Sequence, residues 1–320
     1  MTVTPDAGDL YTGGAGGWHY GLAHHGLNSH GLEIDRWAVA TRRAAGHHVD
    51  QADVTAVDPA DYPARGLTAS PPCRPWSPGG LRQGEADRQL VATAIDDLAA
   101  GRDTRDQLRA ACLNADSLLA AEPMRWIRAL RPEFVCMEQV RPVLPLWQQY
   151  AEHLAAWGYS VWTGVLQAAD YGVPQTRQRA ILAASRVVEV VAPEPTHTGR
   201  HPSMADVLPG VRPDSVLVTR RDSVARRAKY GARPNRRGDQ PAPSITGECW
   251  RWYWRHADGS EEPLTPAQAG ILQGFPAGHP WQGPKTRIAL QIGNAIPKEL
   301  AAAAVGAALG GAQQLLPLAA

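Results

Sequence analysis

Cys73 stands in a short proline-rich stretch, residues 69–77, that reads Ala-Ser-Pro-Pro-Cys-Arg-Pro-Trp-Ser. Proline fixes its own φ angle and moves the preceding residue away from helical backbone, so this loop holds the thiol in one orientation. A rigidly held thiol suits covalent catalysis, because the nucleophile must meet its target atom at close range. Taken alone, such a residue is more often a buried structural cysteine. Other parts of the chain have to decide between these two interpretations.

Three charged side chains elsewhere are candidates to assist such a nucleophile. Glu138 lies near the end of the apolar segment 133–140, which predicts a buried strand. Doubly wound sheets bind ligands beyond the carboxyl ends of their strands. Arg177 and Arg179 precede a second apolar strand at 180–184. Side chains two positions apart point to the same face of an extended chain, so we expect both guanidinium groups to reach one ligand.

A glycine cluster near the start of the chain follows a predicted strand at 9–12 and precedes a helical segment at 18–25. Its members are Gly13, Gly14, Gly16 and Gly17. Strand, glycine turn and helix let the backbone approach a nucleotide closely. Glu33 ends the next predicted strand, where it can bind ribose hydroxyls, and Asp53 follows the third, within reach of an adenine edge. The spacing predicts a nucleoside-bearing cofactor, with surface carboxylates at strand ends as the alternative.

Composition excludes several classes of protein. The 320 residues are 44% hydrophobic with a formal net charge of +1, so we expect a folded core and only local patches for binding nucleic acid. Four scattered cysteines predict reduced thiols, and the histidines between residues 19 and 48 lack paired ligand spacing, so no metal is expected. Neither a signal peptide nor a membrane span is recognisable, which predicts a soluble, cytoplasmic protein.

The composition changes after residue 190. Residues 193–200 read as a linker, and the segment 212–237 is loop-like and basic. Basic and aromatic side chains alternate at 250–255, a combination that suits contacts with phosphates and bases. A solvated charged face is the usual explanation for such a run, but its position beside a candidate catalytic half favours nucleic acid. The basic residues expected to contact it are Arg220, Arg221, Arg226 and Arg227.

These segments, in this order, resemble the cytosine-5 DNA methyltransferase family over nearly the whole chain, from residue 9 to about residue 309. Four pieces carry the resemblance: Pro-Pro-Cys with Trp-Ser at 71–77, Asp-Tyr-Gly-Val-Pro-Gln-x-Arg-x-Arg at 170–179, Leu-Gln-Gly-Phe-Pro at 272–276 and Gln-Ile-Gly-Asn-Ala at 291–295. Any one of them can arise by chance. Their common order argues against coincidence.

The resemblance implies a reaction and roles for its residues. Cys73 would add to carbon 6 of a cytosine flipped out of duplex DNA, and Glu138 would hold the ring at nitrogen 3 and its amino group. Arg179 would contact the exocyclic oxygen, with Arg177 in support, and both would stabilise a thiolate. Carbon 5 would take the methyl group of S-adenosyl-L-methionine. The implied cofactor contacts are Tyr11, Gly13, Gly14, Gly16, Gly17, Glu33, Asp53, Pro72, Leu119 and Asn294.

Four departures from the family's pattern leave the three main catalytic residues intact. The glycine turn carries one residue more than the usual form. Arg74 replaces the usual glutamine after the nucleophile, Trp76 replaces phenylalanine, and Gln139 replaces the commoner asparagine. Arg74 matters most, because it adds a positive charge beside the thiol. The expected substrate contacts are the four basic residues above together with Arg74, Ser77 and Gln175.

The expected fold is α/β, a Rossmann-like class I methyltransferase sheet with a smaller, irregular target-recognition domain. We expect the catalytic and cofactor-binding domain at residues 1–188, the target-recognition domain at 189–285, and a segment 286–320 that returns to the catalytic domain. Double-stranded DNA would lie in the cleft between the domains. We expect a monomer that recognises a short sequence, and a cognate restriction endonuclease is a candidate partner.

Two other functions stay open at this point. A cytosine-5 methyltransferase acting on transfer RNA would suit the same basic stretch. The RNA-directed branch usually carries Cys-Phe-Thr after the catalytic glutamate segment, however, whereas Val140 here precedes Arg-Pro-Val. A catalytically silent DNA-binding protein would have no need of a Pro-Cys nucleophile. We therefore expect an enzyme that acts on DNA.

Overall fold

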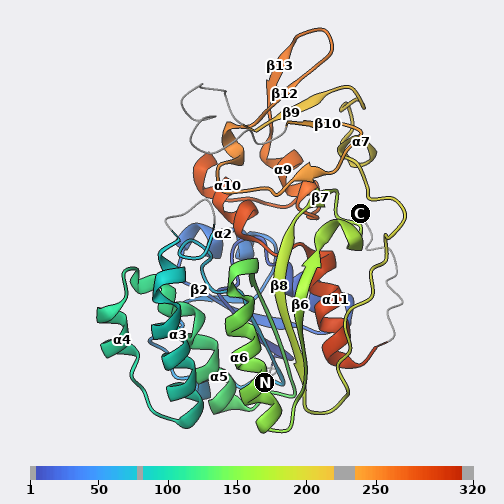
Figure 1. Ribbon diagram of the computed structural model, residues 1–320. Helices are drawn as coiled ribbons and strands as arrows, with labels where there is room; N and C mark the ends of the chain where they lie inside the picture. The colour runs from blue at the N-terminus through green and yellow to red at the C-terminus, as the bar shows by residue number, and fades with distance from the viewer. Residues whose placement is uncertain (1–4, 78–81, 220–234, 312–320) are drawn as a thin grey trace.

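A seven-stranded sheet in the order β3-β2-β1-β4-β5-β8-β6 forms the centre of the computed structural model, which describes residues 5–77, 82–219 and 235–311 (Figure 1). Strands β1 to β5 are parallel, and β8 is antiparallel to both of its neighbours. This arrangement confirms the predicted Rossmann-like α/β class. The strands are β1 (Ala7–Leu10), β2 (Ser29–Glu33), β3 (Val49–Gln51), β4 (Gly66–Ala69), β5 (Phe134–Val140), β6 (Ser160–Gln167) and β8 (Gln178–Ser185).

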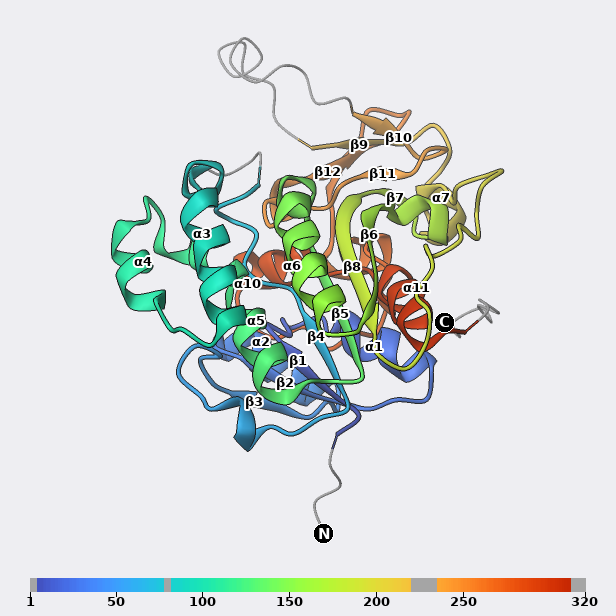
Figure 2. The same ribbon diagram turned by 60° about the horizontal axis from the view of Figure 1, so that its bottom comes forward.

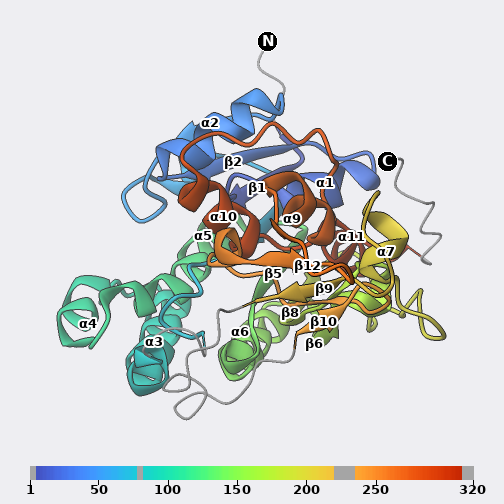
Figure 3. The ribbon, with the colours of Figure 1, turned by 90° about the horizontal axis from the view of Figure 1, so that it is seen from above.

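Helices cover both faces of this sheet because its central strands are apolar on both sides. Successive residues of a strand point to opposite faces, so Phe134 and Cys136 pack with α1 and α11, whereas Val135 and Met137 pack with α3, α5 and α6. Figures 2 and 3 show these two groups of helices on opposite sides of the molecule. The helices are α1 (Gly17–His24), α2 (Arg36–Ala44), α3 (Gln83–Ala100), α4 (Arg105–Ala111), α5 (Glu122–Leu130), α6 (Leu144–Ala156) and α11 (Lys298–Leu309).

The end of the chain packs beside its beginning. Helix α11 is rich in alanine and lies against α1, where small residues allow a close approach. A Cβ atom on Gly21 would lie only 2.8 Å from the backbone nitrogen of Ala302. The short side chains therefore let the last helix join the first βα unit.

One expected helix is divided in two. The sequence pattern predicts a continuous helical stretch over residues 117–130, but the structure has a 3-10 turn, Ala115–Ala120, followed by α5. Pro123 lies in the first turn of α5, where its missing N–H costs no hydrogen bond. The break brings the half-buried Leu119 to the surface of the 3-10 turn.

A small lobe, built on the four-stranded sheet β10-β9-β12-β13, lies above the large sheet (Figure 1). Its buried core contains Leu217, Trp252, Trp254 and Leu272. Helix α10 also belongs to this core through Ala289 and Ile292, although it falls inside the segment expected to return to the catalytic domain. The elements are α7 (Met204–Val207), β9 (Val216–Val218), β10 (Arg236–Arg237), β12 (Tyr253–Arg255), β13 (Glu261–Pro263), α9 (Pro266–Leu272) and α10 (Lys285–Asn294).

A two-residue ladder joins the small lobe to the large one. Strand β7 (Gln175–Thr176) pairs in parallel with β11 (Ala242–Pro243), just before β8 enters the large sheet. Because β8 is antiparallel to β5, this junction lies at the carboxyl end of β5. Within the described ranges, no helix is long and apolar enough to cross a membrane.

Candidate active site

The loop that carries Cys73 begins where β4 ends and is held at several points. The backbone N–H groups of Trp76 and Ser77 both donate to the carbonyl of Cys73, at 3.0 and 2.9 Å, which closes a tight turn after the thiol. The Trp76 side chain is fully buried and anchors that turn in the large core. On the other side, Gln139 Nε2 donates to the carbonyl of Pro71 at 2.6 Å. Gln139, which replaces the commoner asparagine of the family, thus connects the nucleophile loop to the end of β5.

Glu138 and Arg179 form an ion pair beside this loop. Arg179 Nε lies 2.7 Å from Glu138 Oε1, and the two side chains are only 12% and 5% exposed. The pairing of β4 with β5 aligns Ala69 with Met137, so the Cys73 loop and Glu138 leave neighbouring strands at the same edge of the sheet. The structure thus places Glu138 at the edge of the sheet where the sequence pattern predicts a ligand.

The thiol of Cys73 stays protonated at neutral pH in this arrangement. Burial raises the pKa of Cys73 above its ordinary value of 9.0, and the Glu138 carboxylate pushes it the same way. The guanidinium groups of Arg179 and Arg177 lower the pKa but do not outweigh burial. Burial therefore opposes the thiolate that the resemblance implies, whereas the two arginines act in its favour.

Asn294 brings the C-terminal part of the chain to the nucleophile. Cys73 Sγ donates a hydrogen bond to Asn294 Oδ1 at 3.8 Å. Asn294 is the last residue of α10. Because α10 packs in the small lobe, this contact joins the nucleophile loop to that lobe, and Asn294 stands beside the thiol as well as near the expected cofactor residues.

Arg177 and Gln175 are buried connectors, which corrects two expectations. Arg177 is 1% exposed and donates to the carbonyls of Ile245, Gly293 and Ala295 at 3.0, 2.9 and 3.0 Å. These bonds direct Arg177 to the backbone, whereas Arg179 pairs with Glu138, so the two guanidinium groups do not meet at one place as expected.

Gln175 is fully buried as well. It donates to the carbonyl of Leu272 and to the side chain of Gln273, and it accepts from the N–H of Ile245. With its amide satisfied inside the protein, Gln175 has no free surface for contact with DNA. The predicted substrate contact is therefore corrected, and the residue joins β7 to the small lobe.

The predicted cofactor residues line the same edge of the sheet. Glu33, at the end of β2, accepts from the N–H of Gly13 at 2.9 Å and from the N–H of Asp35 at 2.8 Å. Burial raises the pKa of Glu33 while these two hydrogen bonds oppose the rise. Tyr11 donates through its hydroxyl to the carbonyl of Leu119 at 3.2 Å. Asp53 is exposed just beyond β3, and Pro72 is half-buried beside Cys73.

Close packing explains the glycines between Tyr11 and α1. A Cβ atom on Gly14 would lie 2.0 Å from Gln291 Oε1, and one on Gly16 would lie 2.0 Å from Nη1 of the buried Arg42. Gly16 also has a φ of +69°, which favours glycine. Gly17 packs against the carbonyl of Ile296, and Gly13, with a φ of +62°, has no neighbour crowding it. Gly13 is therefore the member with open space for a ligand.

Two residues near this edge carry no assignment from the sequence analysis. Ile34 directly follows Glu33, and its large apolar side chain is 65% exposed. Gln291 belongs to a quoted motif, and its side chain lies against Gly14. The sequence does give one indication for Ile34, because it directly follows the glutamate that we expect to bind the ribose. Only the fold reveals that Gln291 reaches the glycine turn.

The predicted DNA contacts are less well defined. Arg74 is exposed and Ser77 is half-buried on the nucleophile loop. Arg220, Arg221, Arg226 and Arg227 lie outside the described residues. Several described basic residues of the small lobe form exposed ion pairs with nearby carboxylates, among them Arg237 with Asp239, Arg251 with Glu248 and Arg255 with Glu261.

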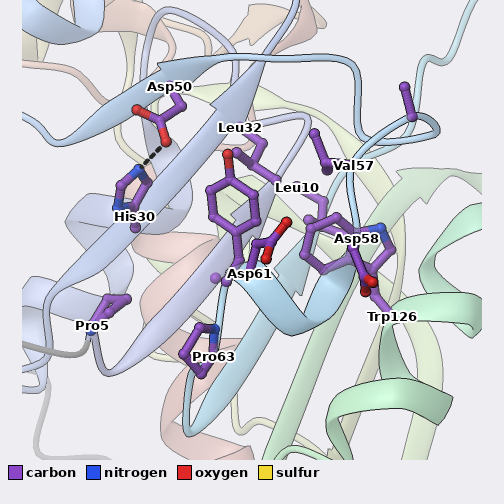
Figure 4. Close-up of a pocket in the computed structure, with 13 residues that line it drawn as sticks. Pro5, Leu10, His30, Leu32, Asp50, Val57, Asp58, Asp61, Pro63 and Trp126 are labelled. Atoms are coloured by element: carbon purple, nitrogen blue, oxygen red, sulfur yellow. Dashed lines mark ion pairs between the residues drawn. The ribbon is translucent and has the colours of Figure 1, made fainter.

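A separate hollow of about 680 Å³ lies under residues 56–63 (Figure 4). Its rim carries Asp50 and His30, whose side chains pair at 3.1 Å. Leu10, Leu32 and Trp126 also line the hollow, and each of them is at most 1% exposed. None of the site residues named above lines this hollow, so the candidate active site is the sheet edge that carries Cys73. Among the described residues, no three His, Cys, Asp or Glu side chains gather as a metal site requires.

Comparisons with known proteins fit this geometry. A family model described as C-5 cytosine-specific DNA methylase matches residues 8–95 and 110–208. The type II methyltransferase M.NlaX of Neisseria lactamica is 28% identical over 264 residues, 76% of each chain. The type II methyltransferase M1.HphI of Haemophilus parahaemolyticus is 25% identical over 224 residues, 60% of each chain.

Solved structures share the fold. The S. pombe Dnmt2 methyltransferase superposes with a TM-score of 0.64 at 15% identity, covering 95% of this chain and 98% of that one. The Entamoeba histolytica methyltransferase EhMeth gives a TM-score of 0.65 at 12% identity, covering 97% and 99%. At these identities the likeness establishes the fold alone.

Proposed function

Because the chain belongs to the C-5 cytosine-specific DNA methylase family, we propose that it methylates carbon 5 of a flipped-out cytosine within a short DNA sequence. The methyl donor is S-adenosyl-L-methionine, and the reaction passes through a covalent bond between Cys73 and carbon 6. The single observation that carries this proposal is the meeting of a rigidly held thiol with the Glu138–Arg179 ion pair at one edge of the sheet.

Cys73 and Glu138 act together on the cytosine ring. The sulfur forms a bond to carbon 6 and the electrons of the C5=C6 double bond shift toward nitrogen 3, while the Glu138 carboxylate takes up the proton of the thiol and passes it to nitrogen 3. This exchange suits a thiol that is neutral before substrate arrives, because no free thiolate has to be maintained. Arg179 holds the Glu138 carboxylate at 2.7 Å and can turn its remaining N–H groups to the exocyclic oxygen.

Addition at carbon 6 makes carbon 5 an enamine carbon, which is nucleophilic. After carbon 5 has taken the methyl group, it loses its proton, and the electrons of that C–H bond restore the ring as the S–C6 bond breaks. The sulfur leaves as a thiolate, the proton from carbon 5 goes to solvent, and the proton on nitrogen 3 returns through Glu138 to the sulfur. Arg177 and Gln175 take no part in these steps. They hold the strand before Arg179 and the segment around Asn294 in place.

The residues on the cofactor side fit an adenosyl ligand. Glu33 has lone pairs left after binding two backbone N–H groups, which suits ribose hydroxyls. Ile34 and Leu119 offer apolar surface for a base, and the space at Gly13 allows the backbone to approach the ligand. When bound, S-adenosyl-L-methionine supplies an electrophilic methyl group. The neutral Asn294 amide beside Cys73 keeps that side of the pocket free of negative charge.

The small lobe is proposed to recognise the target sequence in double-stranded DNA, which would bind between the lobes, with Arg74, Ser77 and the basic segment around Arg220 in contact with it. The domain division of 1–188, 189–285 and 286–320 is part of this proposal, with α10 as a shared element. We also propose that the protein acts as a monomer in the cytoplasm, alongside a restriction endonuclease of the same specificity. The names of its type II relatives support that last point.

Bisulfite sequencing of DNA from cells that express the protein tests the proposal. Wild-type protein should protect cytosines in one short recurring context, and Cys73→Ala should protect none. The matched control is Cys112→Ala, because Cys112 is a half-buried free thiol remote from Glu138 in the fold; it should protect the same sites as wild type. Equal protection by Cys73→Ala would overturn the mechanism. No protection by folded wild type, with methylation of transfer RNA instead, would overturn DNA as substrate.

A further inference from the structure

The loop at residues 53–57 carries Asp53, the proposed adenine contact, and is closed by hydrogen bonds of its own. The N–H groups of Ala56 and Val57 donate to the carbonyl of Asp53 at 3.0 and 3.3 Å. The N–H of Thr55 donates to Asp53 Oδ1 at 2.9 Å. These bonds shape the loop but do not fix its position relative to the sheet, which depends on what its remaining carbonyls meet.

Three side chains bind those carbonyls from a different part of the chain. Arg125 Nη2 donates to the carbonyls of Val54 and Val57 at 2.7 and 3.0 Å. Trp126 Nε1 donates to the carbonyl of Val54 at 3.2 Å, and Arg105 Nη1 donates to the carbonyl of Thr55 at 3.2 Å. Residues of α4 and α5 therefore hold the whole loop.

One buried carboxylate orients both arginines. Glu122 is 2% exposed, and its two oxygens lie 2.5 Å from Arg125 Nε and 2.7 Å from Arg105 Nη1. Asp103 binds Arg105 from its other side at 2.7 Å. A guanidinium group bound by a carboxylate has a fixed plane, so its remaining N–H groups point in defined directions. Here they point at the loop.

The same carboxylate connects to the other proposed adenosine contacts. Glu122 follows Leu119 by three residues, at the junction of the 3-10 turn and α5. Leu119 in turn accepts from the hydroxyl of Tyr11. Burial raises the pKa of Tyr11, and the charges of Glu122, Asp53 and Arg125 all act on its hydroxyl. Tyr11 and Leu119, and the loop that carries Asp53, thus lie close to one charged cluster.

We propose that Glu122, Arg105 and Arg125 form a positioning cluster that sets the adenosine-binding geometry of Asp53, Leu119 and Tyr11. The cluster touches no reacting atom. This assignment rests on the proposed function, because it takes S-adenosyl-L-methionine as the ligand. Its consequence is that the cluster controls affinity for the adenosyl part of the cofactor and leaves the chemical step and DNA binding unchanged.

Glu122→Gln and Arg105→Gln test the assignment, with Glu133→Gln as the matched control. Glu133 also pairs with an arginine, Arg65 at 2.8 Å, but that pair is 33% and 55% exposed at the opposite end of β5. Calorimetric titration should give about tenfold weaker binding of S-adenosyl-L-methionine for both cluster variants. Binding of 5′-methylthioadenosine, which lacks the amino acid part, should weaken by the same factor. At saturating cofactor, kcat and the KM for DNA should match wild type.

The possible outcomes distinguish a cluster that positions the adenosine contacts from one that only stabilises the fold. Circular dichroism identifies variants that fail to fold, and the milder Arg105→Gln then carries the test. Folded variants that bind both ligands as wild type does would overturn the assignment, as would a loss confined to S-adenosyl-L-methionine with 5′-methylthioadenosine unaffected. A wild-type protein that binds neither ligand would overturn the cofactor proposal itself, a result distinct from unchanged affinity in the variants.

Discussion

The carboxyl edge of the large sheet and the surface of the small lobe hold their polar side chains in different ways. At the sheet edge, Glu33, Glu138, Arg177 and Arg179 are largely enclosed by protein and held by ion pairs or backbone hydrogen bonds, as Arg177 is by three carbonyls. On the small lobe, Arg251 and Arg255 each pair with one nearby carboxylate, and these side chains are 42–65% exposed. Buried, fully bonded groups have one arrangement, whereas exposed pairs exchange easily for other partners.

This difference matches the tasks proposed for the two regions. Bond formation at carbon 6 needs the thiol, carboxylate and guanidinium fixed to within fractions of an ångström. Contacts with DNA phosphates need basic groups that can leave one partner for another. In the proposed function, DNA phosphates would replace the carboxylates in the ion pairs of the small lobe. The following predictions test that contrast, beginning with the largest effect.

Replacing Arg177, just before β8, should lower mainly stability, whereas replacing Arg179, within β8, should lower mainly kcat. Arg177→Met removes donors from three backbone carbonyls, so we expect the free energy of unfolding to fall by about 3 kcal/mol, near 1 kcal/mol for each lost bond. Arg179→Met should keep most of the stability but lower kcat by about 10²–10³-fold, because a group that stabilises developing charge is lost. Urea unfolding and single-turnover methylation measure the two effects. A kcat loss without destabilisation in Arg177→Met would contradict the contrast.

Gly14 should be replaceable only when Gln291 is shortened. A Cβ atom at residue 14 would lie 2.0 Å from Gln291 Oε1, so Gly14→Ala must displace that side chain and with it the glycine turn. We expect about tenfold weaker binding of S-adenosyl-L-methionine, measured by titration. Gly14→Ala combined with Gln291→Ala should recover most of the affinity, because φ at residue 14 lies outside the left-handed region. Equal loss in the single and double variants would point to another cause.

Alkylation of Cys73 should report its raised pKa. The thiolate is the reactive form, so the rate of iodoacetamide modification should keep rising above pH 9.0 and not level off below it. Arg179→Met should move the profile to higher pH, and Glu138→Gln should move it to lower pH, because the two charges act in opposite directions. Peptide mass spectrometry separates Cys73 from Cys112. A plateau near neutral pH would mean that burial does not dominate.

The same shift has a consequence for stability. A thiol whose pKa is raised by folding keeps its proton in the native state while the unfolded chain ionises. Its contribution to stability is therefore complete below the ordinary pKa of 9.0 and declines as the pH rises above it. Cys73→Ala should flatten this decline in urea titrations at alkaline pH.

Loss of an exposed pair on the small lobe should have the smallest effect on folding. Arg251 and Glu248 are 53% and 65% exposed, so Arg251→Ala should change the free energy of unfolding by less than about 1 kcal/mol. If Arg251 exchanges Glu248 for a phosphate, the slope of log affinity for DNA against log salt should decrease by about 1. Filter binding at several salt concentrations measures it. An unchanged slope would exclude Arg251 from the DNA interface.

The sequence predicts the large sheet well because its signals are local. Apolar runs such as 133–140 and the glycine turn before α1 identify strands and a βα junction without reference to the rest of the chain. Proline marks the turn at Cys73 for the same reason. The order of four motifs then indicates the family, which the comparisons confirm.

Burial and partners at long range are beyond such signals. Gln175 and Arg179 stand in one motif, yet the first is enclosed by residues 245, 272 and 273 and the second pairs with Glu138. Nothing in their spacing distinguishes them. The protonated state of Cys73 depends equally on how much protein surrounds the thiol. Glu122 looks like an ordinary helix-start glutamate until the fold brings Arg105 to it.

A duplex with 5-fluorocytosine at the target position tests the central claim, that Cys73 bonds to the cytosine ring. Fluorine at carbon 5 cannot leave as a proton does, so the S–C6 bond should persist after methyl transfer. With S-adenosyl-L-methionine present, wild-type protein should form a denaturation-resistant complex with this duplex. Peptide mass spectrometry should locate the bond at Cys73, and Cys73→Ala should form no complex. Methylation of ordinary DNA by wild-type protein, without any adduct at Cys73 on the fluorinated duplex, would contradict the account.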